Sequence, residues 1–207
     1  MPDRPTATRV LIAEDQGMMR SALATLLDLE DDLQVVATIA RGDEVATMVG
    51  RLRPDVVLLD IELPGRSGLD ILPELAVMHP DCIVVVVTTF ARPGYLRRAL
   101  AAGARGFLVK DDPVEELAAS IRRAVAGEVV VDPVLAAQAL SASPNPLNER
   151  ELQVLACSAD GTTIADIART LRLSTSTVRN YLSSAIGKTD SRNRSEALSK
   201  ARDAGWL

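Results

Sequence analysis

Histidine and cysteine are scarce in this chain. Its 207 residues include one histidine, His79, and two cysteines, Cys82 and Cys157. A single histidine excludes His-rich metal sites and most catalysis by Ser-His or Cys-His pairs. The cysteines are 75 residues apart and share no CxxC spacing, so we interpret them as buried free thiols. These features fit a reducing compartment, and we expect the protein to be cytoplasmic.

Long apolar runs are absent as well. No stretch approaches the roughly 20 residues needed to cross a bilayer. The N-terminus has no basic flank followed by an apolar segment, which is the pattern of a signal peptide. Apolar residues make up 47% of the chain and charged residues 25%, as in globular proteins. We therefore expect no membrane insertion.

Charge is distributed unevenly along the chain. Residues 1–130 contain 14 basic and 20 acidic residues, whereas residues 131–207 contain 9 and 8. Eight basic residues lie between Arg169 and Arg202, against only Asp190 and Glu196. An acidic first part and a locally basic second part indicate two domains with different partners. The basic end is the one suited to the phosphate backbone of a nucleic acid.

The first 126 residues alternate between two kinds of pattern. Apolar strand-like runs occupy residues 10–13, 33–39, 56–60, 82–88 and 106–109. Segments with helical periodicity follow them, at residues 17–29, 43–52, 68–78, 93–102 and 113–126. Runs such as "VVLLD" and "CIVVVVTT" are apolar on both faces, as strands covered by helices on each side must be. The pattern predicts a flavodoxin-like (βα)5 domain of the α/β class with a five-stranded parallel sheet.

The pattern changes after residue 126. Residues 127–146, which end in "SPNP", are interpreted as a linker with a short helical stretch. The remaining residues show no strand pattern and predict a small all-α domain of four helices, at about 148–158, 163–171, 175–187 and 194–204. We therefore predict two domains, 1–126 and 147–207.

Acidic, hydroxyl and lysine side chains stand at the ends of four predicted strands. They are Glu14 and Asp15 after the first, Asp60 at the third, Thr88 and Thr89 at the fourth, and Lys110 after the fifth. Because ligands bind beyond the carboxyl ends of the strands in such sheets, we expect these residues to meet at one edge. Each has an ordinary structural explanation alone, such as a helix cap for the doubled acid. Their joint occurrence favours a functional site.

The residue types at this edge indicate phosphoryl chemistry with Mg²⁺. Carboxylate oxygens without histidine or cysteine are the ligands that Mg²⁺ prefers. Asp60 can act as a nucleophile toward phosphorus, as in enzymes that form aspartyl phosphates. Lys110 would supply positive charge to the transferring phosphoryl group, and Thr88 can donate a hydrogen bond to it. Of the doubled acid, Asp15 is the better choice for direct metal contact, with Glu14 acting through water.

Four segments carry a family resemblance. "LIAEDQ", "DVVLLDIELPGRSGLD", "VVVVTT" and "AAGARGFLVKD" resemble the receiver domain of bacterial two-component response regulators over about residues 9–126. The resemblance implies that a sensor histidine kinase phosphorylates Asp60. It implies that Mg²⁺ is held by Glu14, Asp15, Asp60 and the backbone carbonyl of Glu62. It assigns phosphoryl binding and switching to Thr88, Thr89, Phe107 and Lys110, with Phe107 turning inward when Thr88 moves.

Two positions depart from the receiver pattern. Receivers usually carry Lys-Pro, commonly with a cis peptide bond, where this chain has Lys110-Asp111. A cis bond costs about 2.5–4 kcal/mol without proline, so either the loop is trans or its neighbours hold the strain. Phe107 lacks the hydroxyl of the commoner Tyr, so a switch at this position would act through packing alone.

The basic segment predicts a helix-turn-helix. "TTIADIARTL" forms one amphipathic helix, "RLSTS" interrupts it, and "TVRNYLSSAIGK" forms a second helix with Ser174 as its N-cap. The second helix of such a pair enters the major groove. Its polar residues are the expected DNA contacts: Ser174, Thr175, Thr177, Arg179, Asn180, Ser183 and Lys188. A solvated amphipathic helix is the structural alternative.

A second resemblance supports the DNA-binding interpretation. "RELQVL", "IARTLRLSTSTVR" and "NRSEA" resemble a LuxR-type DNA-binding domain, and a receiver followed by this module is the NarL/FixJ plan. The resemblance implies a homodimer when phosphorylated, bound to paired half-sites of double-stranded DNA. Three further segments, "LLDLEDDLQVV", "DIELPGRSGL" and "TTFARPGYLRRA", resemble a response regulator that activates a membrane-lipid desaturase gene. This resemblance implies control of membrane-lipid desaturation.

The predicted dimer face lies on the helices near residues 17–29 and 113–126. Its apolar contacts would come from Met18, Leu29, Leu117 and Ile121, unless these residues face the core.

Two other functions remain open from the sequence. One is an aspartate-nucleophile phosphohydrolase, because "DIE" at residues 60–62 also fits an Asp-x-acid nucleophile motif. The DNA-binding module and the lack of a second catalytic lysine argue against it. The other is a DNA-binding regulator whose receiver is not phosphorylated, and the complete acidic set argues against that. We expect a transcription regulator, not an enzyme, that only assists its own phosphoryl transfer.

Overall fold

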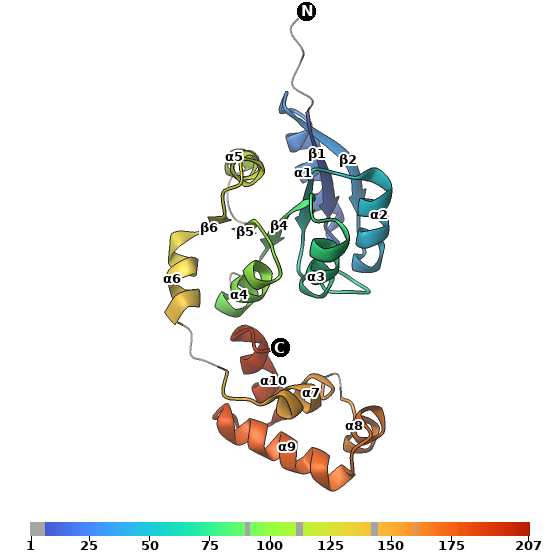
Figure 1. Ribbon diagram of the computed structural model, residues 1–207, viewed down its shortest axis with the longest axis vertical. Helices are drawn as coiled ribbons and strands as arrows, with labels where there is room; N and C mark the ends of the chain where they lie inside the picture. The colour runs from blue at the N-terminus through green and yellow to red at the C-terminus, as the bar shows by residue number, and fades with distance from the viewer. Residues whose placement is uncertain (1–6, 90–91, 111–113, 142–144, 160) are drawn as a thin grey trace, which may run out of the picture. The chain divides into compact units, whose positions relative to one another are not determined.

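The computed structural model describes residues 7–89, 92–110, 114–141, 145–159 and 161–207 (Figure 1). The chain divides into two compact units. The first contains most of the chain up to Ala136, and the second contains Ala137–Leu207. Within the described residues, no helix combines the length and the apolar character that a membrane span needs.

The first unit is a parallel sheet whose strands alternate with helices. Its elements in chain order are β1 Thr8–Ala13, α1 Gly17–Leu27, β2 Leu33–Ile39, α2 Val45–Leu52, β3 Val56–Leu59, α3 Gly68–Met78, β4 Ile83–Thr88, α4 Pro93–Ala101, β5 Gly106–Val109 and α5 Val114–Val125. A 3-10 turn, η1 (Gly42–Glu44), precedes α2. The five predicted strands and five predicted helices are confirmed, with bounds that differ by a few residues.

A sixth strand, β6 (Val130–Val131), extends the sheet beyond the prediction. The strand order is β2-β1-β3-β4-β5-β6 and every pair is parallel. The N–H of Val130 donates to the carbonyl of Arg105 at 2.8 Å, and the Val130 side chain is buried. The five predicted strands are therefore joined by one further short strand, which lies within the segment predicted as a linker. Two residues are too few to show strand periodicity.

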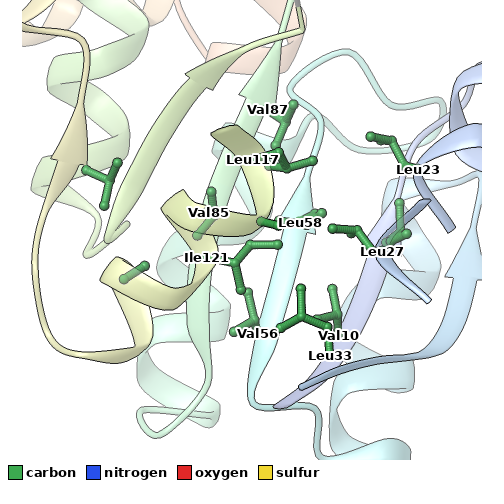
Figure 2. Close-up of a cluster of buried hydrophobic side chains, with 14 residues drawn as sticks. Val10, Leu23, Leu27, Leu33, Val56, Leu58, Val85, Val87, Leu117 and Ile121 are labelled. Carbon is green, nitrogen blue, oxygen red and sulfur yellow. The ribbon is translucent and has the colours of Figure 1, made fainter. Parts of the chain in front are cut away.

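Helices α1 and α5 cover one face of the sheet. Figure 2 shows Leu23 and Leu27 from α1 and Leu117 and Ile121 from α5 converging on strand side chains. The strand residues of this cluster are Val10, Ile12, Leu33, Val56, Leu58, Val85, Val87 and Val130. Because successive strand residues point to opposite faces, the fully buried Leu11, Val57 and Val86 face the other side. Helices on both faces of the sheet therefore explain why its strands carry apolar residues on both sides.

The second unit is all helical. After α6 (Pro133–Ser141), its helices are α7 Glu149–Ala156, α8 Ile164–Leu171, α9 Thr175–Lys188 and α10 Arg194–Asp203, which confirms the four predicted helices within two residues at each end. Each begins at a residue whose side-chain oxygen accepts a backbone N–H: Asn148, Thr163, Ser174 and Asn193. These caps satisfy N–H groups that have no partner within the helix, so the sequence sets the helix starts locally.

Candidate functional site

The strand register aligns the carboxyl ends of the central strands. Ala13 pairs with Leu59, so Glu14 and Asp60 follow neighbouring strands at the same level. The N–H of Asp60 donates to the carbonyl of Ala13 at 2.9 Å, and the N–H of Lys110 donates to that of Thr88 at 2.9 Å. These bonds bring the predicted site residues of β1, β3, β4 and β5 to one edge of the sheet, as the strand-end rule requires.

A buried ion-pair cluster forms at this edge. The Nζ atom of Lys110 lies 2.6 Å from Oε2 of Glu14 and 3.0 Å from Oδ2 of Asp60. All three side chains are at most 3% exposed. One ammonium therefore neutralises part of the charge on two carboxylates that would otherwise repel each other in a poorly solvated site.

Burial and hydrogen bonding oppose each other in this cluster. Burial raises the pKa of Glu14 above its ordinary value, and the hydrogen bond from Lys110 only partly offsets this effect. Burial disfavours the charged form of Lys110, but its hydrogen bonds to Glu14 and Asp60 prevail and raise the pKa of the ammonium. Lys110 is therefore a permanent cation at neutral pH.

Glu14, Asp15 and Asp60 form an oxygen-donor cluster that fits a divalent cation. One carboxylate oxygen from each lies within 4.8 Å of the others. Glu14 is already engaged by Lys110 and by the N–H of Gln16 at 3.0 Å, whereas Asp15 is exposed. An all-oxygen donor set of this kind is typical of a Mg²⁺ site. The side chain of Glu62 is exposed, and the role of its backbone carbonyl stays a prediction.

The residues predicted to act in switching differ in burial. Thr88, the last residue of β4, is completely buried, and Thr89 is exposed. Phe107 in β5 is also completely buried, so in this structure the aromatic ring already has the inward position that the family resemblance links to switching. The Lys110-Asp111 peptide bond, for which the sequence left cis and trans open, lies outside the described residues.

Arg20 is a site residue that the sequence analysis missed. Its guanidinium donates to the carbonyl of Glu14 at 2.7 Å and to that of Asp15 at 3.1 Å. These bonds tie the loop that carries both acids to the start of α1. Its position in the sequence could have indicated this role, because Arg20 is the first basic residue after the doubled acid and lies one helical turn into α1.

Two of the four residues predicted for the dimer face belong to the core. Leu117 is 7% exposed and Ile121 is fully buried, because α5 needs its apolar face to cover the sheet. They cannot supply surface contacts, and that part of the prediction was wrong. Met18 and Leu29 are 88% and 73% exposed and stay available for an interface.

In the second unit, α8 and α9 are joined by a tight turn. Helix α8 ends at Leu171, and its C-cap Arg172 adopts a left-handed conformation with φ of 54°. Ser174 then caps α9, and its Oγ accepts from the N–H of Thr177 at 3.0 Å. This is the helix-turn-helix that the sequence predicts, with α9 as the second helix.

Of the residues predicted to contact DNA, some are exposed on one side of α9, and others bond each other at the start of the helix. Thr175, Arg179, Asn180 and Ser183 are exposed, and their spacing places them on one side of the helix. Ser174 and Thr177 bond each other at the helix start, at 2.7 Å between their hydroxyl oxygens.

Lys188 has a partner within its own domain. Its Nζ lies 2.9 Å from Oε2 of Glu151, a side chain only 3% exposed, which also accepts a 2.7 Å bond from Ser184. Burial would raise the pKa of Glu151, but hydrogen bonds from Ser184, Lys188 and the Asn148 backbone lower it below its ordinary value. The structure thus gives Lys188 a role in joining α9 to α7, and its contact with DNA stays a prediction.

Few cations of the second unit remain unpaired. Arg169 pairs with Asp166, Arg192 pairs with Glu196, and Lys200 donates to the carbonyl of Asp190. Among the residues that the structure describes, the side chains of Arg172, Arg179 and Arg202 make no hydrogen bond or ion pair. Arg172 and Arg179 flank the turn and the exposed side of α9, where a phosphate or a base edge would be met.

Both units match known family models. The model described as "Response regulator receiver domain" matches residues 10–122, and the model described as "Bacterial regulatory proteins, luxR family" matches residues 145–201. The chain therefore belongs to the response regulators that join a receiver domain to a LuxR-type helix-turn-helix. Such a protein is a DNA-binding transcription regulator of a two-component system and not a classical enzyme.

Individual proteins are similar over nearly the whole chain. The uncharacterized transcriptional regulatory protein YvfU of Bacillus subtilis is 45% identical over 201 residues, which cover 96% of this chain and 99% of that protein. The transcriptional regulatory protein DesR of the same organism is 43% identical over 198 residues, which cover 96% and 98%. The crystal structure of the response regulator ChrA of a heme-sensing two-component system is similar with a TM-score of 0.57 at 29% identity, covering 98% and 100%.

Proposed function

We propose that a sensor histidine kinase phosphorylates Asp60 and that this modification switches the protein to a DNA-binding dimer. The observation that carries the proposal is the buried ammonium of Lys110, 3.0 Å from the Asp60 carboxylate at the carboxyl edge of the sheet. An Asp60 oxygen would attack phosphorus as the P–N bond of the kinase phosphohistidine breaks. Lys110 would then offset the charge on a phosphoryl oxygen, and the Thr88 hydroxyl would donate to another.

Mg²⁺ fits the acidic cluster as the metal of this reaction. When bound, it would supply positive charge that neutralises the phosphoryl oxygens and the carboxylates. Glu14, Asp15 and Asp60 are the side chains that would hold it, together with the backbone carbonyl of Glu62. Of the side chains, Asp15 is best placed for direct contact because it is exposed and Glu14 is engaged by Lys110.

The output would be transcriptional control through paired DNA sites. Two copies, joined through a face that includes Met18 and Leu29, would present two α9 helices to half-sites about one DNA turn apart. Thr175, Arg179, Asn180 and Ser183 would meet the groove. We place the protein in the cytoplasm, where this family meets its kinases and DNA. From the sequence likeness to DesR, we propose a gene of membrane-lipid desaturation as a target.

Intact mass after incubation with Mg²⁺ and acetyl phosphate tests the phosphorylation. We expect one phosphate adduct on the wild-type chain, none on Asp60→Asn, and an unchanged adduct on Asp81→Asn, a control at an exposed aspartate before β4. An adduct that persists in Asp60→Asn would overturn the mechanism, as would no adduct on the wild type. A phosphohydrolase would instead release phosphate repeatedly from a small substrate without retaining the adduct.

A further inference from the structure

The first unit contains a cavity beside the proposed phosphorylation site. It has a volume of about 260 Å³ and lies between α1, α5, β5 and β6. Its walls combine polar and apolar side chains, and the apolar ones include Leu23, Val87, Leu108, Leu117 and Val130. Leu23, Val87 and Leu117 belong to the cluster drawn in Figure 2. Ligand pockets typically measure about 300–1,000 Å³, so this cavity suits a small molecule with a single ring.

The hydroxyl of Ser120 lines the cavity. Ser120 on α5 is only 9% exposed. Within the described part of the chain, its hydroxyl makes no hydrogen bond. The Ser120 oxygen is not among the side-chain atoms that are sealed from solvent without a partner, so it is open to the cavity. It can therefore accept a hydrogen bond from a molecule inside the cavity.

The charges around the cavity favour a cation over an anion. Glu116 and Asp132 are exposed acidic residues in its lining. The two cations of the lining are already neutralised, because Lys110 lies between Glu14 and Asp60 and Arg123 pairs with Glu128 at 2.8 Å. The polar rim is therefore acidic, and a carboxylate or phosphate headgroup would be repelled.

We propose that this cavity binds a small amine with an apolar body. The apolar part would pack against Leu108 and Leu117, its ammonium would face Glu116 and Asp132, and Ser120 would accept a hydrogen bond from it. The apolar walls would supply most of the affinity, and the acidic rim would supply the preference for a cation.

Three probes of similar shape test the ligand class on the full-length chain. They are 2-phenylethylamine, 2-phenylethanol and phenylacetate, which differ in the charge of one group. In NMR titrations, we expect saturable shifts at Phe107, Leu117, Ser120 and Val130 with the amine, weaker binding of the alcohol and no binding of the acid. No saturable shift with the amine, shifts elsewhere, or equal binding of the acid would overturn the proposal.

Matched variants test the location. Ser120→Leu fills the cavity and should abolish saturable binding, whereas Ala119→Leu, at the exposed neighbouring position on α5, should not change it. If Ser120→Leu disturbs the fold, the double variant Glu116→Gln and Asp132→Asn tests whether the amine binds in this cavity. It should lose the preference for the amine over the alcohol while the alcohol still binds. Amine binding that is unchanged in a folded Ser120→Leu, or a preference retained in the double variant, contradicts the proposal.

Discussion

The Nζ atom of Lys110 lies 2.6 Å from Oε2 of Glu14, and both side chains are 2% exposed. The two residues follow β5 and β1, which are separated in the sheet by β3 and β4. Lys110 therefore reaches across the carboxyl edge and joins Glu14 of the acidic cluster to Asp60, the proposed phosphoacceptor. In this structure the ammonium balances the charge that a bound cation would otherwise offset.

This arrangement predicts that the stability of the first unit depends on Lys110 and on Mg²⁺. Lys110→Ala leaves the buried Glu14 and Asp60 without their cation, which should cost about 3–5 kcal/mol of unfolding free energy in EDTA. Mg²⁺ should recover part of this loss because it binds the folded cluster alone. Chemical denaturation followed by circular dichroism measures both effects. The exposed Arg105 serves as the control, and Arg105→Ala should change the stability by less than about 0.5 kcal/mol. If Lys110→Ala loses the same unfolding free energy with and without Mg²⁺, the acidic cluster that Lys110 neutralises does not bind Mg²⁺.

Leu29 and Leu117 should separate dimerisation from folding. Leu29→Asp, at a surface position of the first unit, should prevent phosphorylation-dependent dimerisation and leave the fold intact, as measured by sedimentation with acetyl phosphate. Leu117→Ala should instead destabilise the unit by about 2–5 kcal/mol, because it opens a cavity in the core. Val77→Asp, at an exposed position on α3, is the matched surface control. A dimer retained in Leu29→Asp and lost in Val77→Asp would move the interface to the other face.

Arg179 and Lys188, both basic residues of α9, should behave differently on DNA. Arg179→Ala should weaken binding by about 1–3 kcal/mol if the side chain reads a base, or lower the salt slope by about one if it contacts a phosphate. Lys188→Ala should mainly destabilise the second unit, by about 1–2 kcal/mol, because its ion pair with Glu151 is only partly buried. Arg202→Ala, at an exposed position of α10, is the control for loss of net charge. Titration of DNA at several salt concentrations measures the affinity and the salt slope of each variant. If Arg179→Ala changes neither, Arg179 does not contact DNA.

The stability of the second unit should fall in acid through Glu151. Its folded pKa lies below the ordinary value of 4.5, so the unfolded state takes up protons first as the pH falls. The stabilisation is therefore complete above about pH 4.5 and is lost as the pH falls through the folded pKa. The fluorescence of Trp206, the only tryptophan of the chain, reports on this unit because the ring packs against its core. Glu151→Gln should reduce the acid dependence, and an unchanged slope in that variant would assign the effect to other carboxylates.

Much of the fold could be predicted because its signals are local. Apolar runs marked β1 to β5, helical periodicity marked the helices, and polar N-caps such as Ser174 marked their starts. The site at the sheet edge followed from the same pattern, because parallel strands bring their carboxyl ends together. Glu14, Asp60 and Lys110 could thus be assembled from three strand ends without coordinates.

Side-chain partners across the chain could not be predicted in this way. The periodicity of α5 shows that Leu117 and Ile121 share an apolar face, but not whether the sheet or a second copy covers it. Lys188 and Glu151 lie 37 residues apart, and no local pattern indicates that one is buried and bonded to the other.

The sequence by itself therefore determined the class of each domain, the order of its elements and the chemistry at the ends of the strands. These properties depend on backbone hydrogen bonding and on the period of apolar residues, which are written along the chain. Only the tertiary structure decided that Lys110 bridges Glu14 and Asp60, that Arg20 holds the acidic loop and that β6 joins the sheet. Each of these depends on distances between segments that are remote in sequence, which packing alone sets.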